Sequence, residues 1–290
     1  MNPFTIQPWA HRALVVSTLA VGFFVSPAAG QNEPHTGKSQ GPVVILPPPG
    51  AGFGMTKTAP ASLHLPGREY RTGEGWLALS CSATCKLSTT RLTVTPKAHQ
   101  QYDGEPVPGQ WLTFTPAPPP QTLMVFKPYQ PPADKLALRT GQVTTYYPGF
   151  PSKLKRSTGT AGTLEGEIAL ADGRVVRFVP TLLLPNPNKP PSPERDHTAY
   201  PLVLDLMLDG KRQSLGSFSF GIEGNGGVKP QDYIRWAGDL DGDGQLDLVV
   251  RLDFSSGTEY VLWLSSMAKP GELVGLAGSF NYFPIDISGC

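Results

Sequence analysis

Four aspartates within nine residues near the C-terminal end have the spacing of a cation-binding loop. Asp239, Asp241, Asp243 and Asp247 stand in the pattern D-x-D-G-D-G-x-x-D. Alternate residues of a tight loop can turn their oxygens toward one centre, and Ca²⁺ binds about six to eight oxygens. Gly244 is the sixth loop residue, where the backbone must turn in a way that a side chain resists. The pattern therefore predicts a calcium site.

The residues that flank the loop indicate β-structure on both sides. In the EF-hand pattern the twelfth loop position is a bidentate glutamate followed by a helix, whereas this chain has Val250 there. Leu246, Leu248 and Val250 alternate with their neighbours in a run rich in branched residues, which predicts a strand. Residues 233–237 (YIRWA) are apolar and aromatic and predict a strand before the loop. We therefore expect a β-hairpin and not a helix–loop–helix.

The segment WAGDLDGDGQLDLVV, residues 236–250, resembles the FG-GAP/VCBS type of repeat, which is the calcium-loop hairpin of integrin-like β-propellers. The resemblance covers about residues 232–264. It implies five calcium ligands, namely the side chains of Asp239, Asp241, Asp243 and Asp247 and the backbone carbonyl of Gln245. Propellers repeat their blade about four to eight times. This sequence has one copy, so we expect the hairpin without a full propeller.

The alternative to a calcium site is a pair of ordinary turns. Asp-Gly pairs mark hairpin turns, and residues 241–244 hold two of them in succession. The two further aspartates at ligand spacing favour the cation, in a structural role that holds the hairpin together.

The N-terminal end has the order of a secretory signal peptide. Residues 1–12 hold no acid, residues 13–25 (ALVVSTLAVGFFV) are an apolar run, and small residues follow to Gly30. We expect cleavage after Gly30, which removes residues 1–30. Thirteen apolar residues are fewer than the roughly twenty that a membrane span needs, although an uncleaved anchor is the alternative. The prediction is a secreted or periplasmic protein with no membrane span after cleavage.

The charge balance argues against nucleic acid as a partner. The chain has 24 Lys and Arg and 23 Asp and Glu, and Arg12 is the one charged residue in the predicted signal peptide. Nucleic-acid binding needs a basic face, so we expect no nucleic acid as a partner. Free calcium is abundant outside the cytosol, which agrees with the predicted loop.

Three cysteines are present: Cys81, Cys85 and Cys290. In an oxidising compartment the near pair Cys81 and Cys85 predicts a small disulfide loop. A zinc site at this pair is the weaker alternative, because zinc needs four ligands, and pairing of Cys290 with either cysteine stays open. If the near pair closes, Cys290 is left over and a Cys290-linked dimer is one expectation.

The sequence has 32 glycines and 32 prolines, and their clusters separate a linker and short strands along the chain. Residues 31–67 contain a Pro-Pro-Pro-Gly run and predict a flexible linker. No segment of helical period stands out, so we predict an all-β protein of antiparallel sheets, sandwich or barrel-like, in one or two modules. Two modules would be 68–150 with the cysteine pair and 159–290 with the calcium loop. Predicted strands beside the calcium hairpin are 76–80, 91–95, 110–115, 122–127, 142–147, 164–170, 174–179, 202–208, 214–220 and 259–264.

Two catalytic arrangements find no support in the sequence. It has no H-E-x-x-H, and Asp196 and His197 would point apart on a strand because they are neighbours. Paired carboxylates for glycoside hydrolysis could be drawn from four acidic residues, but the sequence spacing does not fix their separation in space. These candidates are Asp205, Glu223, Asp253 and Glu259.

Our first hypothesis is a secreted or periplasmic calcium-binding protein with a structural or binding role and a protein or glycan partner. One alternative is a hydrolase that acts on an extracellular glycan and has a structural calcium. Another is a partner protein in an envelope assembly.

Overall fold

The computed structural model describes residues 39–47, 62–99, 105–119, 121–127, 138–149, 155–158, 164–182, 200–220, 230–254 and 257–282. By its contacts the chain divides into Met1–Pro34 and His35–Cys290, and every described residue belongs to the second unit. The predicted signal peptide and Cys290 lie outside the described residues. No helix in the described part is long and apolar enough to cross a membrane.

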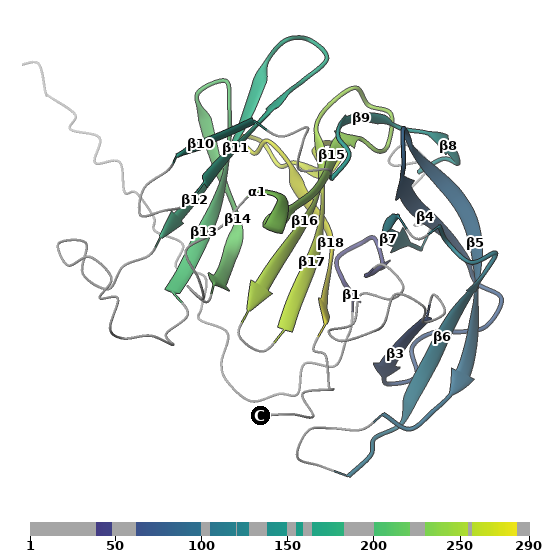
Figure 1. Ribbon diagram of the computed structural model, residues 1–290. Coiled ribbons are helices and arrows are strands. Elements are labelled where there is room, and N and C mark those ends of the chain that lie inside the picture. Colours follow the sequence, from purple (N-terminus) through teal and green to yellow (C-terminus); the bar gives the residue numbers. More distant parts are fainter. Residues whose placement is uncertain are drawn as a thin grey trace, which may run out of the picture. The chain divides into compact units, whose positions relative to one another are not determined.

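The described residues form three antiparallel β-sheets, so the predicted all-β class is confirmed (Figure 1). Their only helical elements are the single turn α1 (Pro230–Tyr233) and the 3-10 turn η3 (Ser265–Met267). The three sheets have six, five and seven strands.

The six-stranded sheet contains the predicted calcium hairpin. Its order is β1 (Ser39–Gln40), β18 (Gly275–Tyr282), β17 (Gly257–Leu264), β16 (Asp247–Phe254), β15 (Ile234–Asp239) and β9 (Thr144–Tyr147). Strands β15 and β16 pair with Gly238 opposite Asp247 at the loop end. Strand β17 returns along β16 with Trp263 opposite Leu248 and leads into η3. This pairing places η3 at the same end of the sheet as the loop.

The five-stranded sheet is a simple meander. Its order is β10 (Lys155–Thr158), β11 (Leu164–Ala169), β12 (Val175–Leu182), β13 (Tyr200–Leu208) and β14 (Lys211–Phe220). Asp209 and Gly210 connect β13 to β14 with φ of 51° and 75°, and Leu208 pairs with Lys211. Positive φ at both residues of a two-residue turn defines the type I′ hairpin that Asp-Gly favours.

The seven-stranded sheet carries the cysteine pair. Its order is β2 (Ile45–Leu46), β7 (Thr122–Phe126), β4 (Gly75–Cys81), β5 (Cys85–Pro96), β6 (Gly109–Thr115) and β3 (Ser62–Pro66), with β8 (Gly141–Gln142) on β5. Cys81 pairs with Cys85 across the β4–β5 hairpin. Their sulfur atoms are 2.05 Å apart, which is the length of a disulfide bond.

The six-stranded sheet is buried on both faces. Val249 and Leu262 belong to one core cluster, which also contains Trp76 and Phe126 of the seven-stranded sheet. Leu248 and other residues of β16 belong to a second cluster, which they share with the five-stranded sheet. A strand buried on both faces reads as a continuous apolar run, which explains the sequence Leu248-Val249-Val250.

The two ranges predicted as modules, 68–150 and 159–290, are joined by strand pairing. Strand β9, from the range 68–150, pairs with β15, and both belong to one compact unit. The range 31–67, predicted as a flexible linker, contains β2 and β3 among its described residues. Ile45, Leu46 and Leu65 are at most 1% exposed. Their apolar runs are short and lie near prolines and glycines, so they do not stand out in the sequence.

Candidate metal centre

The loop between β15 and β16 is shaped by its own aspartates. The two carboxylate oxygens of Asp239 accept hydrogen bonds from the backbone N–H groups of Gly242 (2.8 Å) and Gly244 (3.0 Å). Both glycines have positive φ, 81° and 80°, which a residue with a Cβ adopts only with strain. Asp243 accepts from the N–H of Gln245 at 2.8 Å in a local turn. The spacing of Asp and Gly thus supplies the local hydrogen bonds of the turn.

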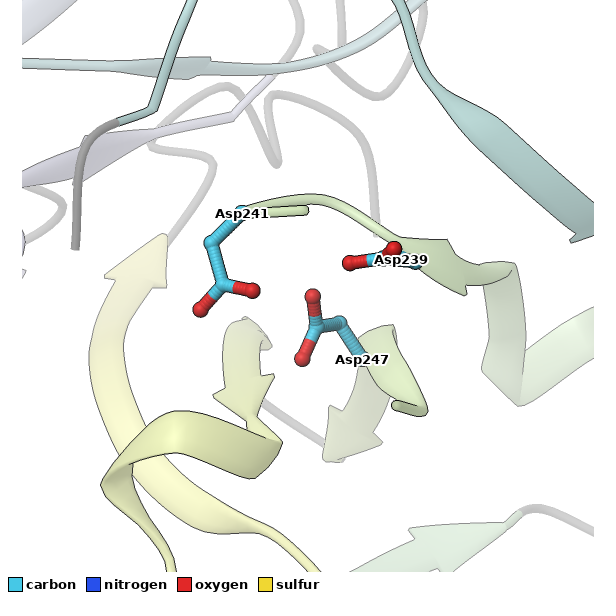
Figure 2. A group of neighbouring side chains, drawn as sticks. All are labelled: Asp239, Asp241 and Asp247. Atoms are coloured by element: carbon cyan, nitrogen blue, oxygen red, sulfur yellow. The ribbon is translucent and has the colours of Figure 1, made fainter. Parts of the chain in front are cut away.

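Three of the four predicted aspartates converge on one space. One carboxylate oxygen from each of Asp239, Asp241 and Asp247 lies within 4.8 Å of the others, and Figure 2 shows the three side chains pointing toward one another. Ca²⁺ binds oxygens at 2.3–2.6 Å, so two oxygens on one ion lie at most about 5 Å apart. The three carboxylates therefore fit a shared cation.

Asp247 is the most buried member of this group, with no exposed surface. Its carboxylate accepts hydrogen bonds from the N–H of Leu240 (2.6 Å) and from the N–H of Ser265 (2.8 Å). Burial and, after it, the negative charge of Asp241 raise the pKa of Asp247 to about 8. Burial also raises the pKa of Asp241, and the charge of Asp243 adds to this effect.

These raised pKa values show that the folded loop disfavours its own negative charge. A divalent cation would remove that cost, because it attracts each carboxylate more strongly than the carboxylates repel one another. The donors are all oxygens, which hard cations such as Ca²⁺ prefer. The residues present therefore fit a calcium ion by the distance between their oxygens and by the type of donor.

Asp243 and Gln245, the other two predicted ligands, lie differently. Asp243 is exposed and stands outside the group of three; its Oδ2 accepts a hydrogen bond from the hydroxyl of Ser265 at 2.9 Å. Gln245 is exposed in the same loop. Their role as ligands stays a prediction.

Two serines at the site could not be identified from the sequence. The hydroxyl of Ser265 also lies 3.1 Å from Oδ1 of Asp247, and Ser266 donates its hydroxyl to Oδ2 of Asp241 at 2.5 Å. Both belong to η3, which follows β17. They are 18 and 25 residues from the aspartates that they contact, and only the pairing of β16 with β17 brings them to the loop.

Comparison with protein-family models, with curated proteins and with solved structures found no match to this chain. The resemblance to the FG-GAP/VCBS repeat rests on the loop sequence and stays a prediction.

The carboxylates considered for glycoside hydrolysis are not brought together among the described residues. Asp205 is buried and paired with Arg212 at 2.5 Å. In the β16–β17 pairing Asp253 is opposite Thr258, and Glu259 is opposite the preceding residue of β16. Asp253 and Glu259 therefore point to opposite faces of the sheet. Glu223 and His197 lie outside the described residues.

A pocket of about 290 Å³ borders the loop at Gly244, Gln245 and Leu246. Its other side is formed by the β11–β12 and β13–β14 turns, where Arg174 forms ion pairs with Asp172 (2.6 Å) and Asp209 (3.0 Å). The volume is at the small end of ligand pockets. The β15–β16 loop is therefore one wall of this pocket.

Proposed function

We propose that the β15–β16 loop binds one Ca²⁺ and that this protein is a secreted or periplasmic calcium-binding protein of the FG-GAP/VCBS type with a structural or binding role. The observation that carries the proposal is the convergence of Asp239, Asp241 and Asp247 within 4.8 Å, with Asp247 fully buried. A buried carboxylate beside two others is costly without a cation. The disulfide between Cys81 and Cys85 supports an oxidising compartment.

The ion acts as a clamp on the hairpin. Asp239 ends β15 and Asp247 begins β16, so one cation between them holds the two strand ends at a fixed separation. Extracellular calcium modules have dissociation constants of about 10⁻⁴–10⁻³ M. At about 2 mM Ca²⁺ and a dissociation constant near 0.1 mM, binding adds about 1.8 kcal/mol to the free energy of unfolding.

We place the binding role at the pocket beside the calcium loop. The pocket bordered by Gly244 and Gln245 includes both charges of the Arg174–Asp209 ion pair, which suit the hydroxyls of a glycan or the polar groups of a protein loop. Calcium fixes the wall that the loop supplies, so the partner would bind with higher affinity in its presence.

Thermal unfolding of the full chain tests the calcium site. We expect a rise of several degrees in the melting temperature between EDTA and about 2 mM CaCl₂, and a smaller rise with MgCl₂. Asp241→Asn and Asp243→Asn should each reduce the calcium-dependent rise. Asp253→Asn is the matched control, because Asp253 lies at the other end of β16 and should leave the rise unchanged. The ligand assignment would be contradicted if calcium raised the melting temperature equally in the wild type and all three variants, or not at all in the wild type.

A further inference from the structure

The buried imidazole of His99 has no hydrogen-bond partner. Its backbone continues the β5–β6 pairing past the end of β5, through a bridge to Val107 with N···O distances of 2.8 and 2.9 Å. The side chain is 5% exposed, and neither ring nitrogen has a partner among the protein atoms. A neutral imidazole has one N–H donor and one lone pair, and each destabilises the fold when it is buried and unpaired.

Packing does not explain why a histidine occupies this position. Gly109 makes room for it, because a Cβ at Gly109 would come within 2.7 Å of the Cβ of His99. A site of this shape accepts an apolar ring at lower cost than an imidazole with two unsatisfied nitrogens. The unpaired nitrogens therefore point to a ligand that is neither backbone nor side chain.

A second histidine lies against the first, although the two are far apart in the sequence. His64 is on β3, which pairs with β6 on the side away from β5. The His64 and His99 ring centroids are 4.7 Å apart and the ring planes meet at 74°. His64 is only partly buried, so it leaves this pair accessible from solvent.

The contact of His64 with a backbone carbonyl indicates which of its ring nitrogens carries the proton. Its Nε2 lies 3.4 Å from the carbonyl oxygen of Lys97. A carbonyl only accepts hydrogen bonds, so Nε2 carries the proton and Nδ1 keeps its lone pair. Histidines that bind metals commonly donate their other N–H to a backbone carbonyl in this way.

The ring separation fits coordination of one ion by both histidines. A nitrogen bound at about 2.0–2.1 Å places its ring centroid roughly 3 Å from the metal. Two rings bound at an angle between perpendicular and tetrahedral then have centroids about 4.5–5 Å apart. The observed 4.7 Å lies in this range. Water reaching the pair beside His64 would complete the coordination shell.

We propose that His64 and His99 form a binding site for a late transition-metal ion of the Zn²⁺ or Cu²⁺ type. Neutral imidazole suits these ions, whereas Ca²⁺ prefers oxygen donors. The site is on the seven-stranded sheet and shares no residue with the aspartate loop of the six-stranded sheet. The protein thus has one site for a hard cation and another for a borderline one.

Lys97 opposes this binding and so provides a sensitive test. Its ammonium nitrogen lies 4.2 Å from the centroid of the Trp111 ring, and that ring is 5.6 Å from the ring of His64. A positive charge at this position lowers the affinity of a nearby cation. Lys97→Gln should therefore tighten metal binding, an effect that a purely structural pair of histidines would not produce.

The experiment is a titration of the full chain with Cu²⁺, followed by calorimetry and electron paramagnetic resonance. A Cys290→Ser background removes the third cysteine as a copper ligand, and about 2 mM Ca²⁺ fills the aspartate loop. We expect one ion per chain with hyperfine coupling to imidazole nitrogen. His64→Gln and His99→Phe should each weaken binding at least about tenfold. His35→Gln and His197→Gln, which remove other histidines, are the matched controls and should leave it unchanged.

His64→Gln decides the question if His99→Phe does not fold, because His64 is only partly buried and its variant should keep the wild-type circular dichroism spectrum. Tighter binding in Lys97→Gln, together with loss in His64→Gln, supports the site. Absence of a bound ion in the wild type, or equal affinity in the wild type and His64→Gln, overturns it and leaves the two rings as packing alone.

Discussion

The backbone N–H of Ser265 donates to Oδ1 of Asp247 over 2.8 Å, and the hydroxyl of the same serine lies 3.1 Å from the same oxygen. The two residues are 18 positions apart and belong to different hairpins. The hydroxyl also lies 2.9 Å from Asp243, yet its single proton serves only one carboxylate at a time. The 3-10 turn after β17 thus packs against the loop and holds the carboxylate of Asp247, its most buried aspartate, in place.

Ser265→Ala should lower the free energy of unfolding in EDTA by about 1 kcal/mol, the contribution of one typical side-chain hydrogen bond. The backbone N–H bond to Asp247 remains in this variant, so we expect the fold to persist. Urea denaturation measures the change, with Ser217→Ala on an exposed position of β14 as the control. Equal stability of the two variants would contradict the role of the hydroxyl.

Gly244→Ala should destabilise the loop through its backbone alone. Gly244 has φ of 80°, and a Cβ built there meets nothing within 4 Å. Gly75 is also surrounded by open space but has no positive φ, which makes Gly75→Ala a matched control. We expect a loss of about 1–2 kcal/mol for Gly244→Ala and weaker calcium binding, against little change for Gly75→Ala. Chemical denaturation with and without Ca²⁺ measures both, and similar losses would exclude a conformational cause.

The features that the sequence predicts correctly are those encoded by neighbouring residues. The Asp-Gly pair at 209–210 forms its type I′ turn, and Cys81 and Cys85 meet across one hairpin, because each needs only a few adjacent residues. The aspartate loop folds for the same reason, since the carboxylate of Asp239 satisfies the N–H groups of its own turn.

The features that were missed depend on contacts between distant strands. Ile45 and Leu65 are core residues in a stretch that reads as a linker, since strands of two and five residues leave a weak periodic signal. Strands β10 and β18 were missed as well. Ser265 contacts the aspartate loop, and His64 contacts His99, only because intervening strands pair in a particular register. No local spacing contains this information.

Removal of both cysteines should lower stability by a modest amount. The bond closes a loop of five residues between Cys81 and Cys85, for which chain entropy predicts about 2 kcal/mol. Both side chains are at most 2% exposed, so alanine is the replacement that avoids an unpaired buried hydroxyl. Urea unfolding of Cys81→Ala/Cys85→Ala should match that of the reduced wild type. A reductant should not change the stability of this variant. If it does not change the stability of the wild type either, the wild type has no disulfide to reduce.

Glu259→Gln should stabilise the protein at neutral pH. Glu259 is partly buried on β17, and burial raises the pKa of its carboxyl, although a hydrogen bond with Ser279 opposes this. The folded state therefore holds the proton more tightly than the unfolded state, so stability falls as pH rises through the window above the ordinary glutamate pKa. Glutamine carries no charge, and we expect the gain of Glu259→Gln at pH 7 to shrink as pH falls toward about 4. Urea unfolding at both pH values measures it, with Glu105→Gln as an exposed control. A gain that is the same at both values would show that charge burial is not its cause.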